Sequence, residues 1–179
     1  MAEKSLVMED TLRILLEKKR YTSIKDVFTT MNGADIAPIL ESLAPETIPV
    51  LFRLLPKELA AETFVEMDPS RQEMLIKGFS DSELHEVINE LFVDDAAALV
   101  EEMPANVVNR ILAQADPAMR KEINDILLYP EDSAGSIMTT EFVDLSPKMT
   151  VAQAISHIRR TGVDKETIYT CYVTEKKQL

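Results

Sequence analysis

The stretch of residues 68–117, DPSRQEMLIKGFSDSELHEVINELFVDDAAALVEEMPANVVNRILAQADP, decides the fold. Short apolar segments alternate in it with turns that carry proline or aspartate, and the same pattern begins upstream near residue 44. The turns recur every ten to thirteen residues, at Ala44-Pro45, Leu55-Pro56, Asp68-Pro69, Ser80-Asp81, Val93-Asp94, Met103-Pro104 and Asp116-Pro117. Proline suits the first turn of a helix and not its interior, so each segment predicts one short helix.

Helices of eight or nine residues are not stable alone, because few hydrogen bonds offset the cost of nucleation. They must stack and bury apolar stripes such as that of Leu84, Val87, Ile88 and Leu91. The sequence therefore predicts a mostly α fold, a superhelix of short helical hairpins, without fixing its hand.

Several residues are expected to begin or end these helices. Asp68 and Asp116 stand just before prolines and are candidate N-caps, and Ser80 with Glu83 forms a capping-box pattern. Further upstream, helices are expected over residues 5–20 and 23–31, the second ending at Asn32-Gly33 in a left-handed cap.

The pattern changes after Tyr129. The segment 129–140 is expected to be a linker between a helical domain over residues 1–128 and a second domain over residues 141–179. In that second domain, strands are expected at residues 142–145 and 168–173, with a helix that Thr150 caps between them. This β-α-β order predicts a truncated α/β domain, because a last strand at the end of a chain has few partners.

Composition and charge limit the function. The net charge is −12, which argues against nucleic acid and against direct contact with an anionic membrane surface. The single cysteine, Cys171, excludes an internal disulfide, and no apolar run is long enough to span a bilayer, so a cytoplasmic chain is expected. No zinc-binding spacing, glycine-rich phosphate loop or nucleophile elbow occurs, so we expect no enzymatic activity.

The acidic stretch offers a candidate cation site. No lysine or arginine occurs between Lys77 and Arg110, and that gap holds eight acids: Asp81, Glu83, Glu86, Glu90, Asp94, Asp95, Glu101 and Glu102. Convergent carboxylates are the ligands that hard cations such as Mg²⁺ and Ca²⁺ prefer. The alternative is an ordinary solvated face in which Asp94 and Asp95 only favour a helix N-terminus. Spacing alone does not decide between the two.

Four segments resemble the MgtE family of magnesium transporters and channels. Residues 32–37 (NGADIA), 54–62 (LLPKELAAE) and 90–97 (ELFVDDAA) resemble its intracellular N domain. Residues 129–141 (YPEDSAGSIMTTE) resemble the junction between that domain and the first CBS domain, and residues 166–169 (ETIY) resemble the second strand of that CBS domain.

The resemblance implies a cytosolic Mg²⁺ sensor at the cytoplasmic face of the cell membrane. In the family, cations between acidic faces of the N domain and of paired CBS domains hold a homodimer compact and close the pore. Mg²⁺ is therefore the expected ligand, with Ca²⁺ or Mn²⁺ as substitutes, and the transmembrane pore domain would lie outside this chain.

The resemblance maps the family's cation ligands onto Asp94 and Asp95, and Glu90, from the acidic stretch, and Glu101 complete the candidate metal set. A second family acid one turn further along falls on Ala98, so Glu101 is the candidate to replace it. CBS pairs in some relatives also bind ATP, but a family aromatic near that site matches Thr170, and we expect no ATP site in this chain.

The competing interpretation is a protein-interaction scaffold without cation sensing, since similar helical repeats occur in the flagellar rotor protein FliG. That interpretation predicts a basic protein partner. The CBS-like residues after 141 count against it.

Overall fold

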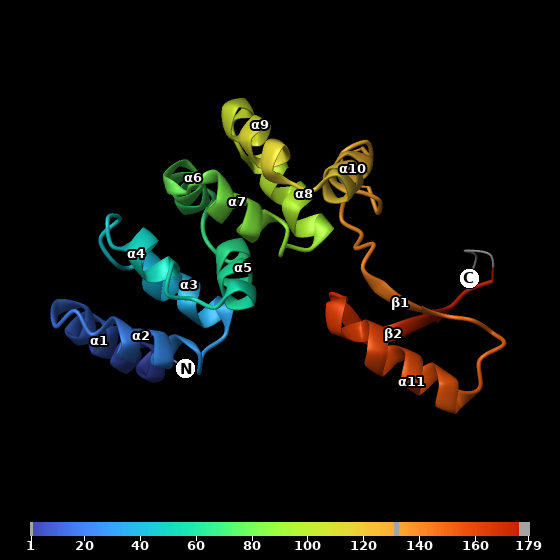
Figure 1. Cartoon of the computed structure of the whole chain (residues 1–179), viewed down its shortest axis with the longest axis horizontal. Coiled ribbons are helices and arrows are strands. Elements are labelled where there is room, and N and C mark those ends of the chain that lie inside the picture. Colours follow the sequence, from blue (N-terminus) through green and yellow to red (C-terminus); the bar gives the residue numbers. More distant parts are fainter. Residues whose placement is uncertain (1, 131–132, 176–179) are drawn as a thin grey trace. The chain divides into compact units, whose positions relative to one another are not determined.

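The computed structural model describes residues 2–130 and 133–175, which form two compact units (Figure 1). The first comprises the residues up to Leu91 together with Ala98–Arg120, and the second comprises Phe92–Ala97 together with the residues from Lys121 onward. The helices before residue 127 are α1 (Ala2–Glu17), α2 (Tyr21–Phe28), α3 (Gly33–Glu41), α4 (Ile48–Phe52), α5 (Lys57–Val65), α6 (Pro69–Gly78), α7 (Asp81–Ile88), α8 (Val93–Glu102), α9 (Ala105–Gln114) and α10 (Pro117–Ile126). The remaining elements are β1 (Phe142–Leu145), α11 (Val151–Thr161), the 3-10 turn η1 (Gly162–Asp164) and β2 (Thr167–Val173). The expected mostly α fold with a small C-terminal β-α-β segment is confirmed.

Local capping explains where several helices begin. The capping box of Ser80 and Glu83 is present at the start of α7, and a second one joins Thr150 to Gln153 at the start of α11. Asp68 stands at the N-cap position of α6, but its side chain makes no capping hydrogen bond, so that part of the expectation is wrong. Its amide instead donates to Glu41 Oε1 at 2.6 Å, which ties the turn to an earlier helix.

The expected left-handed cap at Asn32-Gly33 is also wrong. Asn32 begins α3 rather than ending α2, since its side chain accepts a hydrogen bond from the amide of Asp35 at 2.9 Å. The left-handed residue is Lys19, with φ of 53°, just after α1. There the amides of Lys19 and Arg20 donate to Leu16 and Leu15, the two bonds of a Schellman motif.

Alternate helices of the first unit stack on one another, α3 on α5, α5 on α7 and α7 on α9. The hairpins bury an aromatic cluster in which the ring of Phe52 lies 6.3 Å from that of Phe64 and 5.5 Å from that of Phe79. Side chains such as Leu84 and Ile88, from the stripe expected on α7, are fully buried. The core of this unit therefore lies along the stack of hairpins.

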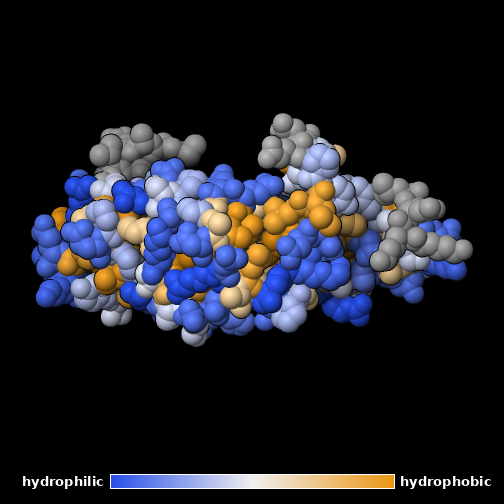
Figure 2. All heavy atoms as spheres, turned by 90° about the horizontal axis from the view of Figure 1, so that it is seen from above, coloured by the Kyte–Doolittle hydropathy of each residue, from blue (hydrophilic) through white to orange (hydrophobic). Residues whose placement is uncertain are grey.

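Figure 2 shows charged and polar side chains over much of the surface in view, with hydrophobic patches between them.

The contact between α3 and α5 depends on glycine. A Cβ atom added at Gly33 would lie 2.6 Å from the carbonyl carbon of Glu62 and 2.7 Å from the amide nitrogen of Thr63. Both atoms belong to the backbone of α5, so no side-chain rotation can relieve the clash. Thr63 is itself fully buried, and its hydroxyl donates to the Leu59 carbonyl at 2.7 Å within the same helix.

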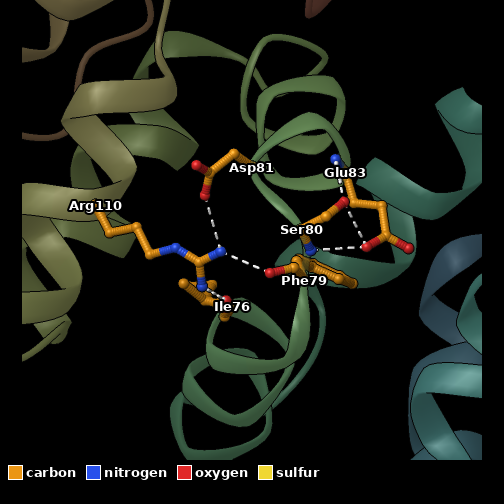
Figure 3. A network of polar contacts seen from close by, with 6 residues as sticks. All are labelled: Ile76, Phe79, Ser80, Asp81, Glu83 and Arg110. Carbon is orange, nitrogen blue, oxygen red and sulfur yellow. Dashed lines mark hydrogen bonds and ion pairs between the residues drawn. The ribbon is translucent and has the colours of Figure 1, made fainter.

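Arg110 of α9 binds the end of α6 (Figure 3). Its guanidinium donates to the carbonyls of Ile76 and Phe79, the latter at 2.6 Å, and contacts Asp81 Oδ1 at 3.2 Å. The last carbonyls of a helix lack partners within the helix, so one side chain satisfies groups that would otherwise need water. This contact joins hairpins that lie about thirty residues apart in the sequence.

The second unit contains a parallel pair of strands, with Phe142 opposite Thr167 and Leu145 opposite Val173. Helix α11 connects them, as in a β-α-β unit. Val143 is buried, and the rings of Phe142 and Tyr172 meet edge to face at 5.4 Å. None of the described side chains of α11 is fully buried.

We expect Gly33→Ala to lower the free energy of unfolding by about 1–3 kcal/mol, because the new methyl group meets backbone that cannot move without shifting α5. Gly78→Ala is the matched control. A Cβ at that position meets nothing within 4 Å, so the change should be neutral or stabilising by roughly 0.4–1 kcal/mol. Urea unfolding of the two variants measures both effects. Equal stability of the two variants would contradict the close contact.

Arg110→Met should lower the free energy of unfolding by about 1–3 kcal/mol, since it keeps the stem and leaves the part-buried carbonyls of Ile76 and Phe79 without their donor. Asp81→Asn removes only the exposed ion pair and should cost less than about 0.5 kcal/mol. Chemical denaturation compares the two. A larger loss in Asp81→Asn would mean that the ion pair, and not the carbonyl contacts, is the stabilising part.

Candidate carboxylate site

The four expected site residues fall in different surroundings. Asp94 and Asp95 lie in the first turn of α8 and belong to the second unit. Glu90 lies just after α7, and Glu101 is exposed near the end of α8; both belong to the first unit. We describe each pair within its own unit.

Glu90 is engaged by a base that lies far away in the sequence. Its Oε2 atom is 2.8 Å from Nζ of Lys57 at the start of α5, and this hydrogen bond is the main reason why the pKa of Lys57 is raised. Glu83 is paired in the same way with Arg53 at 2.6 Å. This contact and two hydrogen bonds from Ser80 lower the pKa of Glu83 to about 2. Part of the acidic stretch is therefore neutralised by bases at the end of α4 and the start of α5.

Asp94 is the least satisfied of the expected site residues. Its Oδ1 atom is buried and has no hydrogen-bond partner. Burial raises the pKa of the carboxyl, the charge of Glu166 raises it further, and the amides of Asp94 and Asp95 oppose these effects. A buried carboxylate oxygen without a donor is costly, so this atom marks a place where a positive charge would be stabilising.

Glu141 approaches the same helix end from the segment before β1. Its Oε2 atom accepts a hydrogen bond from the amide of Val93 at 2.9 Å, which satisfies one free donor of α8. Burial raises the pKa of Glu141. The hydrogen bond from the Val93 amide and the charge of Lys165 oppose this rise, and the charges of Asp94 and Glu122 add to it. We call Asp94, Glu141 and Glu166 the carboxylate cluster.

The candidate list from the sequence did not contain Glu141 and Glu166. Each is the residue just before a strand, and the two strands are parallel, so their first residues meet at the same edge of the sheet. The amide of Glu166 donates to the carbonyl of Glu141 at 3.2 Å, which fixes this neighbourhood. Glu141 directly before the first expected strand, and Glu166 two residues before the second, were the available signal.

The cluster fits a hard cation in its chemistry, because all of its side chains offer carboxylate oxygens and one of those oxygens lacks a donor. Ligand geometry is not complete in this conformation. Among the described residues, no group of three or more His, Cys, Asp or Glu side chains is arranged to hold a metal ion. The arrangement can therefore attract a cation, and closer approach of the carboxylates would be needed to coordinate it directly.

The site residues Asp95 and Glu101 add acidity on α8. Asp95 is partly buried beside Asp94, and Glu101 points to solvent in the last turn of the helix.

Within the described ranges, no helix is both long and apolar enough to cross a membrane.

A family description and several known proteins match this chain. The model of the MgtE intracellular N domain matches residues 31–132, more than half of the chain. A magnesium transporter MgtE from Thermus thermophilus is 33% identical over 181 residues, which cover 99% of this chain and 39% of that protein. The chain thus spans well under half the length of this curated relative.

Two solved structures share the fold. One, described as the cytosolic domain of the Mg²⁺ channel MgtE in complex with ATP, has a TM-score of 0.84 and 31% identity over 94% of this chain and 69% of that chain. The other, the soluble part of a magnesium transporter, has a TM-score of 0.87 at 21% identity over 97% of this chain and 68% of that chain. The stack of helical hairpins followed by a β-α-β segment is the fold of the MgtE cytosolic domain. The chain belongs to the MgtE family, as the resemblance implied.

The raised pKa of Asp94 predicts a pH dependence. A carboxyl whose pKa is higher in the folded state favours its protonated form there, so stability falls as the pH rises from about 3.8 through the raised pKa. At pH 7 without divalent cations, we expect Asp94→Asn to raise the free energy of unfolding by roughly 0.5 kcal/mol, because solvent screens this partly exposed site.

Urea unfolding at several pH values measures this effect, with Glu102→Gln, an exposed acid on the same helix, as the control. The advantage of Asp94→Asn should vanish in acid, where the wild-type carboxyl is protonated. A loss of stability in Asp94→Asn that grows as the pH rises would instead show that charged Asp94 is favourable where it lies.

Proposed function

We propose that this chain is the Mg²⁺-sensing regulatory region of an MgtE-type magnesium transporter or channel. The observation that carries the proposal is the buried Asp94 oxygen without a donor, placed among the carboxylates of Glu141 and Glu166. Membership of the MgtE family supports magnesium as the cation.

The proposed sensing step depends on electrostatic repulsion between carboxylates, which a bound cation would relieve. The charge of Glu166 raises the pKa of Asp94, and the charge of Asp94 raises the pKa of Glu141, so without a cation these carboxylates repel one another. A bound Mg²⁺ would supply two positive charges and oxygen coordination, directly or through its water molecules. Asp94 and Glu141 would then lie closer together, with Glu166 beside them. The chain thus becomes more compact and more stable when the cation is present.

The proposed ligand set is Asp94 with Glu141 and Glu166, and Asp95 as a further acid on the same helix turn. Glu90 is a weaker candidate, because its carboxylate already binds Lys57. Glu101 is exposed and would contribute to cation binding only through long-range charge. Ca²⁺ and Mn²⁺ prefer the same oxygen ligands and should substitute with different affinity.

The transporter context is part of the proposal. The Thermus relative is more than twice as long as this chain, which leaves room for a pore domain outside residues 1–179. The regulatory region would then lie at the cytoplasmic face of the membrane, in a homodimer, and would close the pore when Mg²⁺ is abundant. A FliG-like scaffold role is less favoured, because it leaves the carboxylate cluster without a purpose.

A thermal melt with and without Mg²⁺, against NaCl at matched ionic strength, tests the cation site. Mg²⁺ at ten times its dissociation constant adds about 1.4 kcal/mol to the free energy of unfolding. For a domain of this size, that should raise the midpoint by roughly 3–6 °C.

The variants make the test specific. Asp94→Asn and Glu141→Gln should each abolish most of the Mg²⁺-dependent shift, and Glu102→Gln should keep it. A shift of the same size in MgCl₂ and in NaCl, or an undiminished shift in Asp94→Asn, would refute the proposed site.

A further inference from the structure

A pocket of about 330 Å³ lies in the first unit, between α4, α5 and α7. Its apolar lining comes from Phe52, Leu55, Ala60, Phe79 and Val87. These side chains keep only 3–9% of their surface exposed, so they form the inner part of the pocket. Its charged lining includes Arg53 and Lys57, whose side chains are about half exposed at 46% and 52% and therefore stand at the mouth.

Three acids follow one another along α7 and the turn after it. Glu83 and Glu86 line the pocket from one face of α7, three residues apart, and Glu90 lies in the turn after the helix, where it binds the lining residue Lys57. The two outer acids are paired with bases from the preceding hairpin, Glu83 with Arg53 at 2.6 Å and Glu90 with Lys57 at 2.8 Å.

The middle acid of this row, Glu86, is different. It lines the pocket and is exposed, and no base makes an ion pair with it in the described part of the chain. Lys57 feels its charge but is bonded to Glu90. The row therefore has two cations for three carboxylates, and the open position lies at the pocket mouth.

One wall of the pocket is already fixed before any partner binds. Glu83 accepts hydrogen bonds from the amide and the hydroxyl of Ser80, at 2.7 and 2.8 Å, besides its contact with Arg53. A rigid wall lowers the entropy cost of binding. The pocket volume lies near the lower end of the range for ligand sites and is large enough for one long side chain.

We propose that this pocket receives an arginine side chain from a basic segment of a partner protein. The apolar stem would lie against Phe52, Phe79 and Val87, and the guanidinium would pair with Glu86 and complete the row of three ion pairs. The acidic surroundings match a basic partner, since residues 31–128 carry nineteen acids and seven bases. The pocket belongs to the first unit and Asp94 to the second, so this inference does not depend on the Mg²⁺ site.

The experiment is an NMR titration of the ¹⁵N-labelled protein in Mg²⁺-free buffer. The probe is the peptide acetyl-Ala-Ala-Arg-Ala-Ala-amide, and two further peptides carry citrulline or norleucine in place of arginine. Citrulline keeps the shape without the charge, and norleucine keeps only an apolar stem. We expect the arginine peptide to shift amide signals at residues 52–60 and 79–87, and both substitutes to bind at least severalfold more weakly.

Glu86→Gln should weaken the arginine peptide by about fivefold, the effect of losing one partly exposed ion pair. Glu102→Gln, an exposed acid that does not line the pocket, should leave the affinity unchanged. Equal binding of the norleucine peptide would overturn the proposal in favour of a purely apolar ligand. Signal shifts spread over all surface acids, no shifts at millimolar peptide, or full affinity in Glu86→Gln would also overturn it.

Discussion

The helical part of this structure depends on the stacking of helices that are too short to be stable alone. Helices α2 to α10 have at most ten residues each, so their stability comes from burial between hairpins and not from their own hydrogen bonds. The backbone contact at Gly33 sets the distance between α3 and α5, and Arg110 holds the end of α6 by its carbonyls. The stack then places bases of one hairpin beside acids of the next, as Arg53 lies beside Glu83.

Cross-hairpin pairing divides the acidic stretch into two kinds of carboxylate. Glu83 and Glu90 stabilise the contact between hairpins, because each binds a base that lies just after α4 or at the start of α5. Asp94 is partly buried beside other acids, and its Oδ1 atom has no hydrogen-bond partner among the residues that the structure describes. The proposed cation sensing needs carboxylates that no base neutralises, because the cation-free protein must be less stable than the cation-bound protein.

The sequence predicted the fold from its turn spacing, because prolines and caps such as Ser80 act locally. It also pointed to Asp94 through the family resemblance. The partners were not predictable. Lys57 lies thirty-three residues before Glu90, and Glu141 reaches Asp94 only through the register of β1 and β2. Such neighbours depend on the stack and the parallel strands, which no local pattern specifies. Local rules also misplaced the left-handed residue, which is Lys19 and not the pair at Asn32-Gly33.

The capping of α8 by Glu141 has a consequence for synthesis on the ribosome. The Val93 amide and its acceptor are separated by 48 residues, so the helix emerges long before the side chain that completes its first turn. Hairpins before α8 can stack while the chain is still growing, since domains generally fold from the N-terminus as they are made. The first turn of α8 therefore gains its final hydrogen bond only after the residues just before β1 have been translated. Completion of the helical part is in this way tied to the start of synthesis of the α/β part.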